Sequence, residues 1–251
     1  MGRLQGKVVL VTGAGRPPGR GFATRFTRDG AAVIAVDHDA PEPSGPADLA
    51  ATVAAVETAG GRICASSADA RDPKALAAAV AAGTRRFGRL DAVVVGPVVT
   101  APGSITGTPD DAWHDTLDRV LTTAWTTCRV ALAHLVDGGS ITVVASAAGL
   151  RGFAHLAPHA AAEHGVVGLV RSLAHELAPR SIRVNSVHPT DDGRASLPEP
   201  SGRLVFDPEA DVPVPFAAAR DVSETVLYLA SDDARMLSGL TVPVGAELVS
   251  R

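Results

Sequence analysis

Cysteine, lysine and tyrosine are all scarce in this chain, and each shortage excludes something. The two cysteines, Cys64 and Cys128, are too few for a disulfide framework, and they stand in a predicted strand and a predicted helix. We therefore expect buried free thiols and a reducing, cytoplasmic location. Tyr228 is the only tyrosine, and Lys7 and Lys74 are the only lysines. Chemistry that needs a tyrosine or a lysine anywhere else in the chain is excluded.

Long apolar runs and an excess of basic charge are also missing. The longest apolar stretches, such as residues 8–11 and 92–95, are far shorter than the ~20 residues of a membrane-spanning helix. A strand predicted from residue 7 leaves no room for a signal peptide, and the myristoylation pattern is not met. The net charge of -4 gives no indication of a nucleic-acid partner. We therefore expect a small-molecule substrate, with no membrane or nucleic acid as partner.

Short apolar segments alternate with longer helical patterns from end to end, in a chain that is 46% apolar and 20% charged. We predict one domain over residues 1–251, with about seven parallel strands and helices on both faces of the sheet, the doubly wound Rossmann architecture. The predicted strands are 7–12, 32–37, 62–67, 90–95, 139–145, 181–187 and 239–243. The predicted helices are 18–29, 47–59, 73–86, 110–136, 158–178 and 218–231. In this fold a ligand binds at the carboxyl ends of the strands.

Residues 189–217 form the one irregular region and are rich in proline, aspartate and glycine. In a doubly wound fold such a segment is expected to lie over the site as a substrate loop or lid. A surface excursion without a functional role is the alternative interpretation.

A glycine-rich turn follows the first predicted strand and precedes the first helix. Gly13, Gly15 and Gly19 let the backbone approach a pyrophosphate, and Arg16 stands among them. Asp37 ends the second strand, where a carboxylate accepts hydrogen bonds from the adenosine ribose of NAD and repels the extra phosphate of NADP. An acid that merely ends a strand is the alternative for Asp37. The turn and the acid together predict an NAD site.

Ser146, His159 and Glu163 form the most informative pattern in the second half of the chain. The segments 139–149 and 159–169 that contain them closely resemble the active-site region of the short-chain dehydrogenase/reductase family. The resemblance covers nearly the whole chain and is closest to the carveol-dehydrogenase-like, mycofactocin-associated branch. It implies an NAD-linked oxidoreductase that assembles into homodimers or homotetramers. In that branch NAD is held tightly and electrons leave through a redox partner.

Further cofactor contacts are implied by the same resemblance. Asp69 and Ala70 match the family's pair beside the adenine, and Gly96 ends the fourth predicted strand in the cofactor region. Pro189 and Thr190, after the sixth predicted strand, match the nicotinamide side.

The cofactor region also departs from the family pattern. Pro17 stands at the middle glycine of the family turn, and a proline has no N–H to offer a phosphate. The segment 95–98 replaces an Asn-Asn-Ala-Gly type of sequence, and Arg194 stands near the usual nicotinamide-binding threonine. We expect NAD binding to be weak or absent, or the site to hold another adenosine-containing ligand.

The catalytic residues depart from the family as well. His159 replaces the family's tyrosine and Glu163 its lysine, while Val120 stands in place of an asparagine, so only Ser146 is retained. A tyrosine of pKa near ~10 needs a neighbouring cation to transfer a proton at neutral pH. The tyrosine and lysines that remain elsewhere cannot take these places. Oxidoreductase activity is therefore predicted to be lost or altered.

Four interpretations of the trio are open at this point. His159, with an ordinary pKa near ~6.5, could transfer protons itself with Glu163 one helical turn away. Ser146, His159 and Glu163 also supply the residue types of a hydrolase triad, although no nucleophile elbow surrounds Ser146. A metal site with His155 is disfavoured, because Pro158 is expected to begin the helix and leave His155 in the preceding loop. In the fourth interpretation the chain is a non-catalytic subunit or scaffold partner of an active relative.

Overall fold

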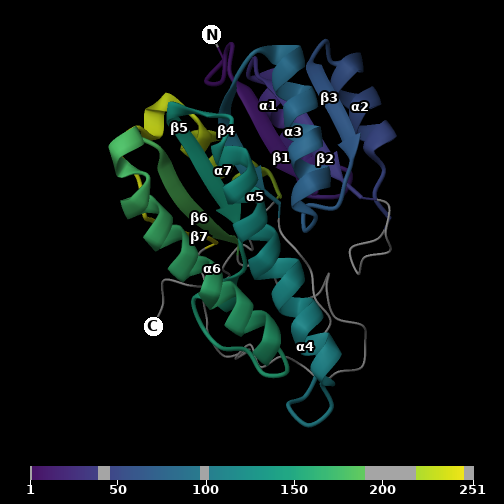
Figure 1. The fold of residues 1–251 in the computed structure, drawn as a ribbon, viewed down its shortest axis with the longest axis vertical. Coiled ribbons are helices and arrows are strands. Elements are labelled where there is room, and N and C mark those ends of the chain that lie inside the picture. Colours follow the sequence, from purple (N-terminus) through teal and green to yellow (C-terminus); the bar gives the residue numbers. More distant parts are fainter. Residues whose placement is uncertain (1, 39–45, 97–101, 190–218, 246–251) are drawn as a thin grey trace, which may run out of the picture.

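The computed structural model describes residues 2–38, 46–96, 102–189 and 219–245. Seven parallel strands form one sheet in the order β3–β2–β1–β4–β5–β6–β7, as Figure 1 shows. The strands are β1 (Val8–Thr12), β2 (Ala32–Asp37), β3 (Arg62–Ser67), β4 (Leu90–Val95), β5 (Leu135–Val144), β6 (Arg183–Pro189) and β7 (Thr241–Val244). The predicted doubly wound sheet is confirmed. The predicted substrate loop, from its second residue on, lies outside the described residues.

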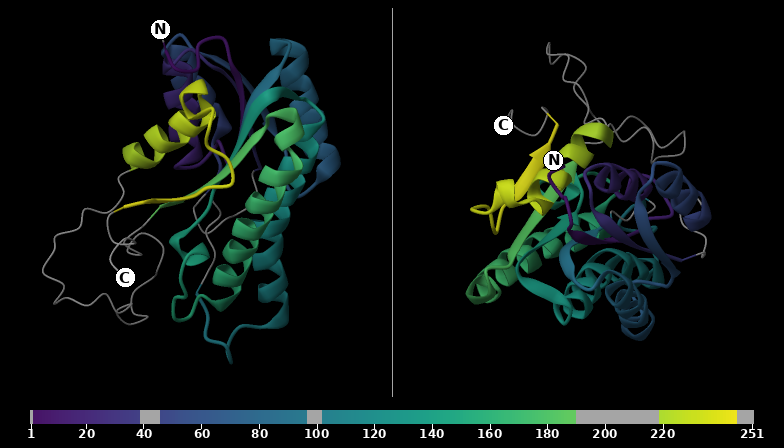
Figure 2. Two further views of the ribbon diagram at one scale, coloured as in Figure 1. Left: turned by 90° about the vertical axis from the view of Figure 1, so that its left-hand side faces the viewer. Right: turned by 90° about the horizontal axis from the view of Figure 1, so that it is seen from above.

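Helices cover both faces of this sheet (Figure 2). They are α1 (Gly19–Arg28), α2 (Leu49–Thr58), α3 (Pro73–Phe87), α4 (Asp110–Leu117), α5 (Thr123–Leu132), α6 (Ala157–Glu176) and α7 (Ala219–Ala230). A search of these described helices finds none that is long and apolar enough to cross a membrane.

Local sequence signals account for where these elements begin. The carboxylate of Asp72 accepts hydrogen bonds from the N–H groups of Lys74 at 2.8 Å and Ala75 at 3.3 Å, directly before α3. Pro73, the first residue of α3, costs no hydrogen bond because N–H groups in the first turn have no partner within the helix. Asp48 caps α2 in the same way, through the N–H of Ala51 at 2.7 Å.

The sheet divides the hydrophobic core into two layers, because its central strands are buried on both faces. On one face, side chains such as Leu76 of α3 and Val170 of α6 pack against the sheet. On the other face, Phe22 of α1 and Val226 of α7 do the same. Figure 1 shows α3, α5 and α6 side by side on the first of these faces.

One predicted helix, 110–136, is wrong in its middle and at its end. A π-helical turn, Asp118–Thr122, separates α4 from α5, and the hydroxyl of Thr123 donates to the carbonyl of Asp118 at 3.2 Å. The helix then stops at Leu132, and β5 starts at Leu135, which pairs with Leu90 of β4. Pairing with the neighbouring strand overrides the local helical pattern here. Gly138, at φ +78°, lies in the part of β5 where the pairing register with β4 shifts.

The sheet topology places the candidate site. Strand order reverses between β1 and β4, which pair directly through Val9 and Ala92. α1, which follows β1, packs on one face of the sheet, and α5, which follows β4, packs on the other. In a doubly wound fold a crevice opens between such elements at the carboxyl edge of the sheet. Gly13 and Gly96, which follow the two strands, lie side by side at this crevice.

Candidate active site

The glycine turn after β1 is packed too tightly for larger residues. A Cβ on Gly19 would lie 2.1 Å from the carbonyl oxygen of Gly13, and one on Gly96 would lie 2.3 Å from that of Thr12. Gly13 itself has φ +68°, a conformation that favours glycine. These glycines bring the start of α1 directly against the ends of β1 and β4. The result is a bare backbone surface of the kind that accommodates a phosphate.

Asp37, at the end of β2, is held in place by the same turn. One carboxylate oxygen accepts the N–H of Gly15 at 2.9 Å, and the other accepts the N–H of His38 at 2.8 Å and pairs with the guanidinium of Arg16. Only 5% of Asp37 is exposed. The structure thus brings the predicted acid and the predicted glycine turn into direct contact.

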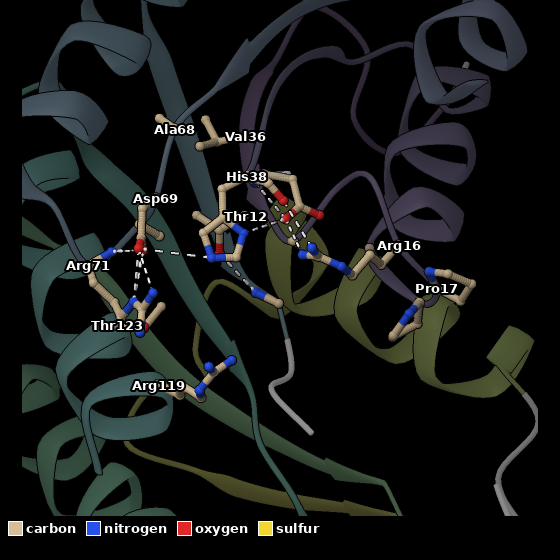
Figure 3. A pocket seen from close by; sticks show the side chains of 16 residues that line it. Thr12, Arg16, Pro17, Val36, His38, Ala68, Asp69, Arg71, Arg119 and Thr123 are labelled. Carbon is tan, nitrogen blue, oxygen red and sulfur yellow. Dashed lines mark hydrogen bonds and ion pairs between the residues drawn. The ribbon is translucent and has the colours of Figure 1, made fainter. Parts of the chain in front are cut away.

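An open cleft starts at this turn and contains about 750 Å³ of empty space, its mouth included. Figure 3 shows Asp69, after β3, between the side chains of Arg71 and His38. Burial raises the pKa of Asp69, but hydrogen bonds from Arg71 outweigh it, so the pKa falls below the ordinary value. The lining residues are Thr12, Gly13, Arg16, Pro17, Pro18, Gly19, Val36, Asp37, His38, Ala68, Asp69, Ala70, Arg71, Gly96, Arg119 and Thr123.

Several lining residues were not anticipated from the sequence. Arg71 and Arg119 approach a common partner, Asp115, at 3.8 and 2.5 Å. Arg119 reaches the cleft from the π-helical turn, across from the glycine turn (Figure 3). The place of Arg71 directly after Asp69 and Ala70 was a usable signal. No pattern marked Arg119, because its side chain faces the cleft through the irregular turn.

A smaller inner cavity, with about 240 Å³ of empty space when its opening is included, adjoins the cleft. Gly96 and Thr123 line both spaces, so the two are adjacent. Most of the inner lining is apolar, and Glu163 is its only titratable side chain. The lining residues are Val95, Gly96, Val120, Thr123, Ala124, Val143, Val144, Ala145, Glu163 and Val166. The cleft beside Asp37 and Asp69 therefore adjoins a cavity lined by Glu163, one residue of the trio predicted from the sequence.

Ser146, His159 and Glu163 lie together where the end of β5 meets α6. Ser146 follows β5, and its backbone N–H donates to Oε2 of Glu163 at 3.2 Å. The other carboxyl oxygen of Glu163 lies 3.8 Å from Nε2 of His159, one turn earlier on α6. His159 is 8% exposed and Glu163 2%. The hydroxyl oxygen of Ser146 accepts the N–H of Ala148 at 3.1 Å.

Burial sets the electrostatics of the pair. It raises the pKa of Glu163 to about 8, although the N–H of Ser146 lowers it in part. It also lowers the pKa of His159 below its ordinary value. Both side chains are consequently uncharged near pH 7. Within the described residues, Nδ1 of His159 is buried without a hydrogen-bond partner.

Sequence comparison identifies the family. A family profile described as enoyl-(acyl carrier protein) reductase matches residues 13–246. The chain is 38% identical, over 98% of each sequence, to (-)-trans-carveol dehydrogenase of Rhodococcus erythropolis. The chain belongs to the short-chain dehydrogenase/reductase family.

Solved structures of the family agree with this assignment. A carveol dehydrogenase of Mycobacterium avium in complex with NAD is 35% identical, has a TM-score of 0.85, and matches 97% of this chain and 98% of its own. A short-chain dehydrogenase of Mycobacterium paratuberculosis bound to NAD is also 35% identical, with a TM-score of 0.87 and 97% of each chain covered. The resemblance to the carveol-dehydrogenase-like branch is confirmed.

We predicted from the sequence that the family's tyrosine, lysine and asparagine are replaced in this chain. Val120, at the asparagine position, lies in the π-helical turn and lines the inner cavity beside Glu163. Lys7 is engaged far from the site, in an ion pair with Asp232 at 2.8 Å. Tyr228 lies on α7 and packs against the opposite core layer. Neither replaces a missing catalytic residue.

Three other residues singled out from the sequence lie at or near the ends of α1, β6 and α6. Pro17 lines the cleft directly before Pro18 and α1. Pro189 ends β6 but does not line the cleft, and Thr190 lies outside the described residues. His155 lies in the loop before α6, as its place before Pro158 predicted.

Proposed function

We propose that this protein is an NAD-linked oxidoreductase that interconverts an alcohol and a carbonyl compound, with His159 as the group that transfers the proton. One observation carries the proposal. The cleft at the glycine turn and Asp37 continues, past Gly96 and Thr123, into a cavity lined by Glu163 beside His159.

The residues of the cleft fit NAD. The bare backbone between Gly13 and Gly19 suits the pyrophosphate, and Asp37 is placed for the adenosine ribose. The carboxylate of Asp37 also disfavours the extra phosphate of NADP. When bound, NAD supplies the hydride acceptor, and NADH the hydride donor, of the reaction. The two NAD-bound relatives support this choice of cofactor.

His159 stands where the proton must be handled. An imidazole accepts or donates a proton near neutral pH without help from a lysine, which this site lacks. Its Nδ1 is buried and has no hydrogen-bond partner in the described part of the chain, so a substrate oxygen would satisfy this atom once the ring turns toward the inner cavity. In the family the retained Ser146 lies beside this position. We expect slower turnover than with the usual tyrosine and lysine, because no cation supports the proton transfer.

A hydrolase triad is less well supported by the same geometry. Nucleophile activation needs a hydrogen bond from the serine hydroxyl to the histidine. Among the described residues, the hydroxyl of Ser146 instead accepts from the backbone of Ala148 and has no hydrogen bond to His159. The contact with Glu163 is made by the backbone of Ser146, which a nucleophile would not use.

Restoring the family residues tests the proposal. His159→Tyr combined with Glu163→Lys is expected to raise the rate of NAD-linked oxidation of carveol and related alcohols, measured as NADH absorbance. NADH binding, measured by fluorescence, is expected in both the wild type and the double variant. A wild type that binds no NADH would contradict the proposal. Binding without turnover in either protein would favour a non-catalytic role.

A non-catalytic subunit is the second candidate, and one surface favours it. Trp113 on α4 and Trp125 on α5 are 38% and 46% exposed in the single chain. Large apolar side chains at a surface often mark a contact with another chain. We propose assembly through α4, α5 and α6 as homodimers or homotetramers, with a hetero-oligomer as the non-catalytic form. Co-purification with an active relative, rather than self-assembly by light scattering, would favour the second candidate.

A further inference from the structure

We propose that Glu163 is a proton relay behind His159: its carboxylic acid donates to Nε2, fixes the imidazole proton on Nδ1, and replaces that proton when the substrate takes it. This inference rests on the proposed function for its final step. The arrangement of the two side chains does not depend on turnover and can be tested without it.

The backbone of Ser146 orients the carboxyl group. Its N–H donates to Oε2 of Glu163 at 3.2 Å, so Oε2 is the acceptor oxygen. Oε1 is then the oxygen that faces His159, 3.8 Å from Nε2. This separation exceeds a hydrogen bond by less than 1 Å, roughly the distance that a small side-chain rotation closes, and such contacts tighten when a ligand binds. The i,i+4 spacing on α6 keeps the two groups adjacent.

The surroundings keep the carboxyl group uncharged. Apolar side chains from β4, the π-helical turn, α5 and β5 line the inner cavity. Among the described residues that line it, Glu163 is the only titratable one. From the π-helical turn, Arg119 faces the outer cleft instead. Burial raises the pKa of Glu163 to about 8. Near pH 7, therefore, a carboxylic acid rather than a carboxylate faces His159.

Other histidines near the pair are engaged elsewhere. On α6 itself, Nδ1 of His164 is bonded to the carbonyl of Ala160 at 2.8 Å. On β6, His188 contacts the carbonyl of Ser146 at 2.7 Å through Nδ1 and the hydroxyl of Ser186 at 2.8 Å through Nε2. Burial lowers the pKa of His188, so it adds no positive charge near pH 7. Among the described residues, His159 is thus the only titratable group placed to accept the Glu163 proton.

The tautomer of His159 follows from this arrangement. A neutral imidazole has one donor and one acceptor nitrogen. If the carboxylic acid of Glu163 donates to Nε2, the imidazole proton resides on Nδ1. Within the described residues this nitrogen is buried and has no partner, which is costly unless a ligand supplies an acceptor. A carbonyl oxygen of the substrate meets that requirement.

Reduction of a carbonyl group to an alcohol requires one hydride and one proton. Bound NADH would supply the hydride for the new C–H bond, and Nδ1 of His159 would give its proton to the carbonyl oxygen, which becomes a hydroxyl. Nε2 takes the proton of Glu163 as the Nδ1–H bond breaks. The imidazole ends in its other neutral tautomer, and Glu163 ends as a carboxylate that a solvent proton restores. Alcohol oxidation follows the same path in reverse and starts from the carboxylate.

The proposal makes the tautomer of His159 dependent on pH. Once Glu163 ionises, its carboxylate accepts a hydrogen bond from Nε2–H, so the imidazole proton moves from Nδ1 to Nε2. Carbonyl reduction should lose rate as pH rises through about 8, the pKa to which burial raises Glu163. Oxidation should gain rate over the same range.

Nitrogen-15 NMR of histidine-labelled protein without ligand tests the tautomer directly. The His159 signals are those that disappear in His159→Phe. The wild type is expected to carry the proton on Nδ1 at pH 7 and on Nε2 at pH 9.5. Glu163→Gln is expected to stay in the Nδ1–H form throughout, because the amide donates to Nε2 at every pH. Glu176→Gln makes the same chemical change at an exposed site on α6 and should behave as the wild type.

The outcomes separate this inference from the proposed function. An Nε2–H form at pH 7 in the wild type, or no change of tautomer up to pH 9.5, would overturn the relay without any measurement of activity. If NADH oxidation is detected, Glu163→Gln should bind NADH normally and turn over roughly ten- to a hundredfold more slowly at pH 7. An unchanged rate and pH profile in this variant would also overturn the relay, while leaving His159 as the proton donor.

Discussion

The backbone N–H of Ser146 donates a hydrogen bond to the carboxyl group of Glu163, which joins the end of β5 to α6 inside the protein. This is the one hydrogen bond that offsets the burial of Glu163, and it does so only in part. Little offsets the cost of burying this acid, so Glu163 affects the stability of the protein, the protonation of His159 and the polarity of the inner cavity.

The stability of the protein should fall with rising pH because of Glu163. Its pKa is raised from an ordinary 4.5 to about 8 in the folded state. Between these values the unfolded chain has lost a proton that the folded chain keeps, so a rise in pH favours unfolding, and the loss is complete above pH 8. We expect a loss on the order of a few kcal/mol, since one pKa unit corresponds to about 1.4 kcal/mol.

Urea denaturation between pH 5 and 9 measures this effect as the difference between the wild type and Glu163→Gln. His159 contributes a separate loss below pH 6.5, because burial lowers its pKa and only the unfolded chain then binds the proton. That contribution is present in both proteins and largely cancels. Parallel stability curves would show that Glu163 is ionised in the folded state at pH 7.

Asp37→Asn should weaken discrimination between NADH and NADPH. The carboxylate of Asp37 accepts the N–H of Gly15 and pairs with Arg16, and its charge opposes an added phosphate. An amide removes that charge and leaves Arg16 to attract the phosphate. We expect the NADH preference to fall roughly tenfold or more, since one charge-assisted hydrogen bond contributes about 1.5–3 kcal/mol. Fluorescence titrations with both nucleotides measure the ratio, and an unchanged ratio would place the adenosine ribose elsewhere.

Pro17→Gly should tighten NADH binding. Pro17 lines the cleft at the turn but has no N–H to donate to the pyrophosphate. We expect the wild type to bind NADH with a Kd above 1 µM, and the variant to bind roughly three- to tenfold more tightly, as one added hydrogen bond of about 1 kcal/mol implies. Submicromolar binding by the wild type would show that the proline costs little. Ala51→Gly, on the outer helix α2, serves as a control for added glycine flexibility.

Val120→Asn should lower the pKa of Glu163. Val120 lines the inner cavity with Glu163, so an amide there can donate to the carboxylate and stabilise its charged form. The pH at which the His159 tautomer changes should move below 8 in this variant. Val120→Ala adds no donor and should leave that pH nearly unchanged. Equal shifts in both variants would indicate that added space and water, rather than the amide, act on Glu163.

The sequence predicted the sheet, the glycine turn and the grouping of Ser146, His159 and Glu163, because each depends on local pattern or on the common carboxyl edge of parallel strands. It did not predict the π-helical turn at Asp118–Thr122, which packs against α6 and is marked by no residue pattern. Arg119, which this turn directs into the cleft, was missed for the same reason.

The charge state of the catalytic pair was also beyond the sequence. An anionic Glu163 one helical turn away would raise the pKa of His159. In the structure burial dominates, so the pKa of Glu163 rises and that of His159 falls. Burial depends on side chains from four separate elements around the inner cavity, and spacing along one helix carries no information about them.

The central claim is that His159 transfers the proton in an NAD-linked reaction, and a comparison of the wild type with His159→Phe tests it most directly. NADH oxidation would be followed at pH 7 with the ketone of carveol and related cyclic ketones, alongside NADH binding by fluorescence. The account predicts slow turnover by the wild type and a loss of at least roughly a hundredfold in the variant, with NADH binding retained. Equal turnover by both proteins, or NADH binding with no turnover by the wild type, would contradict it.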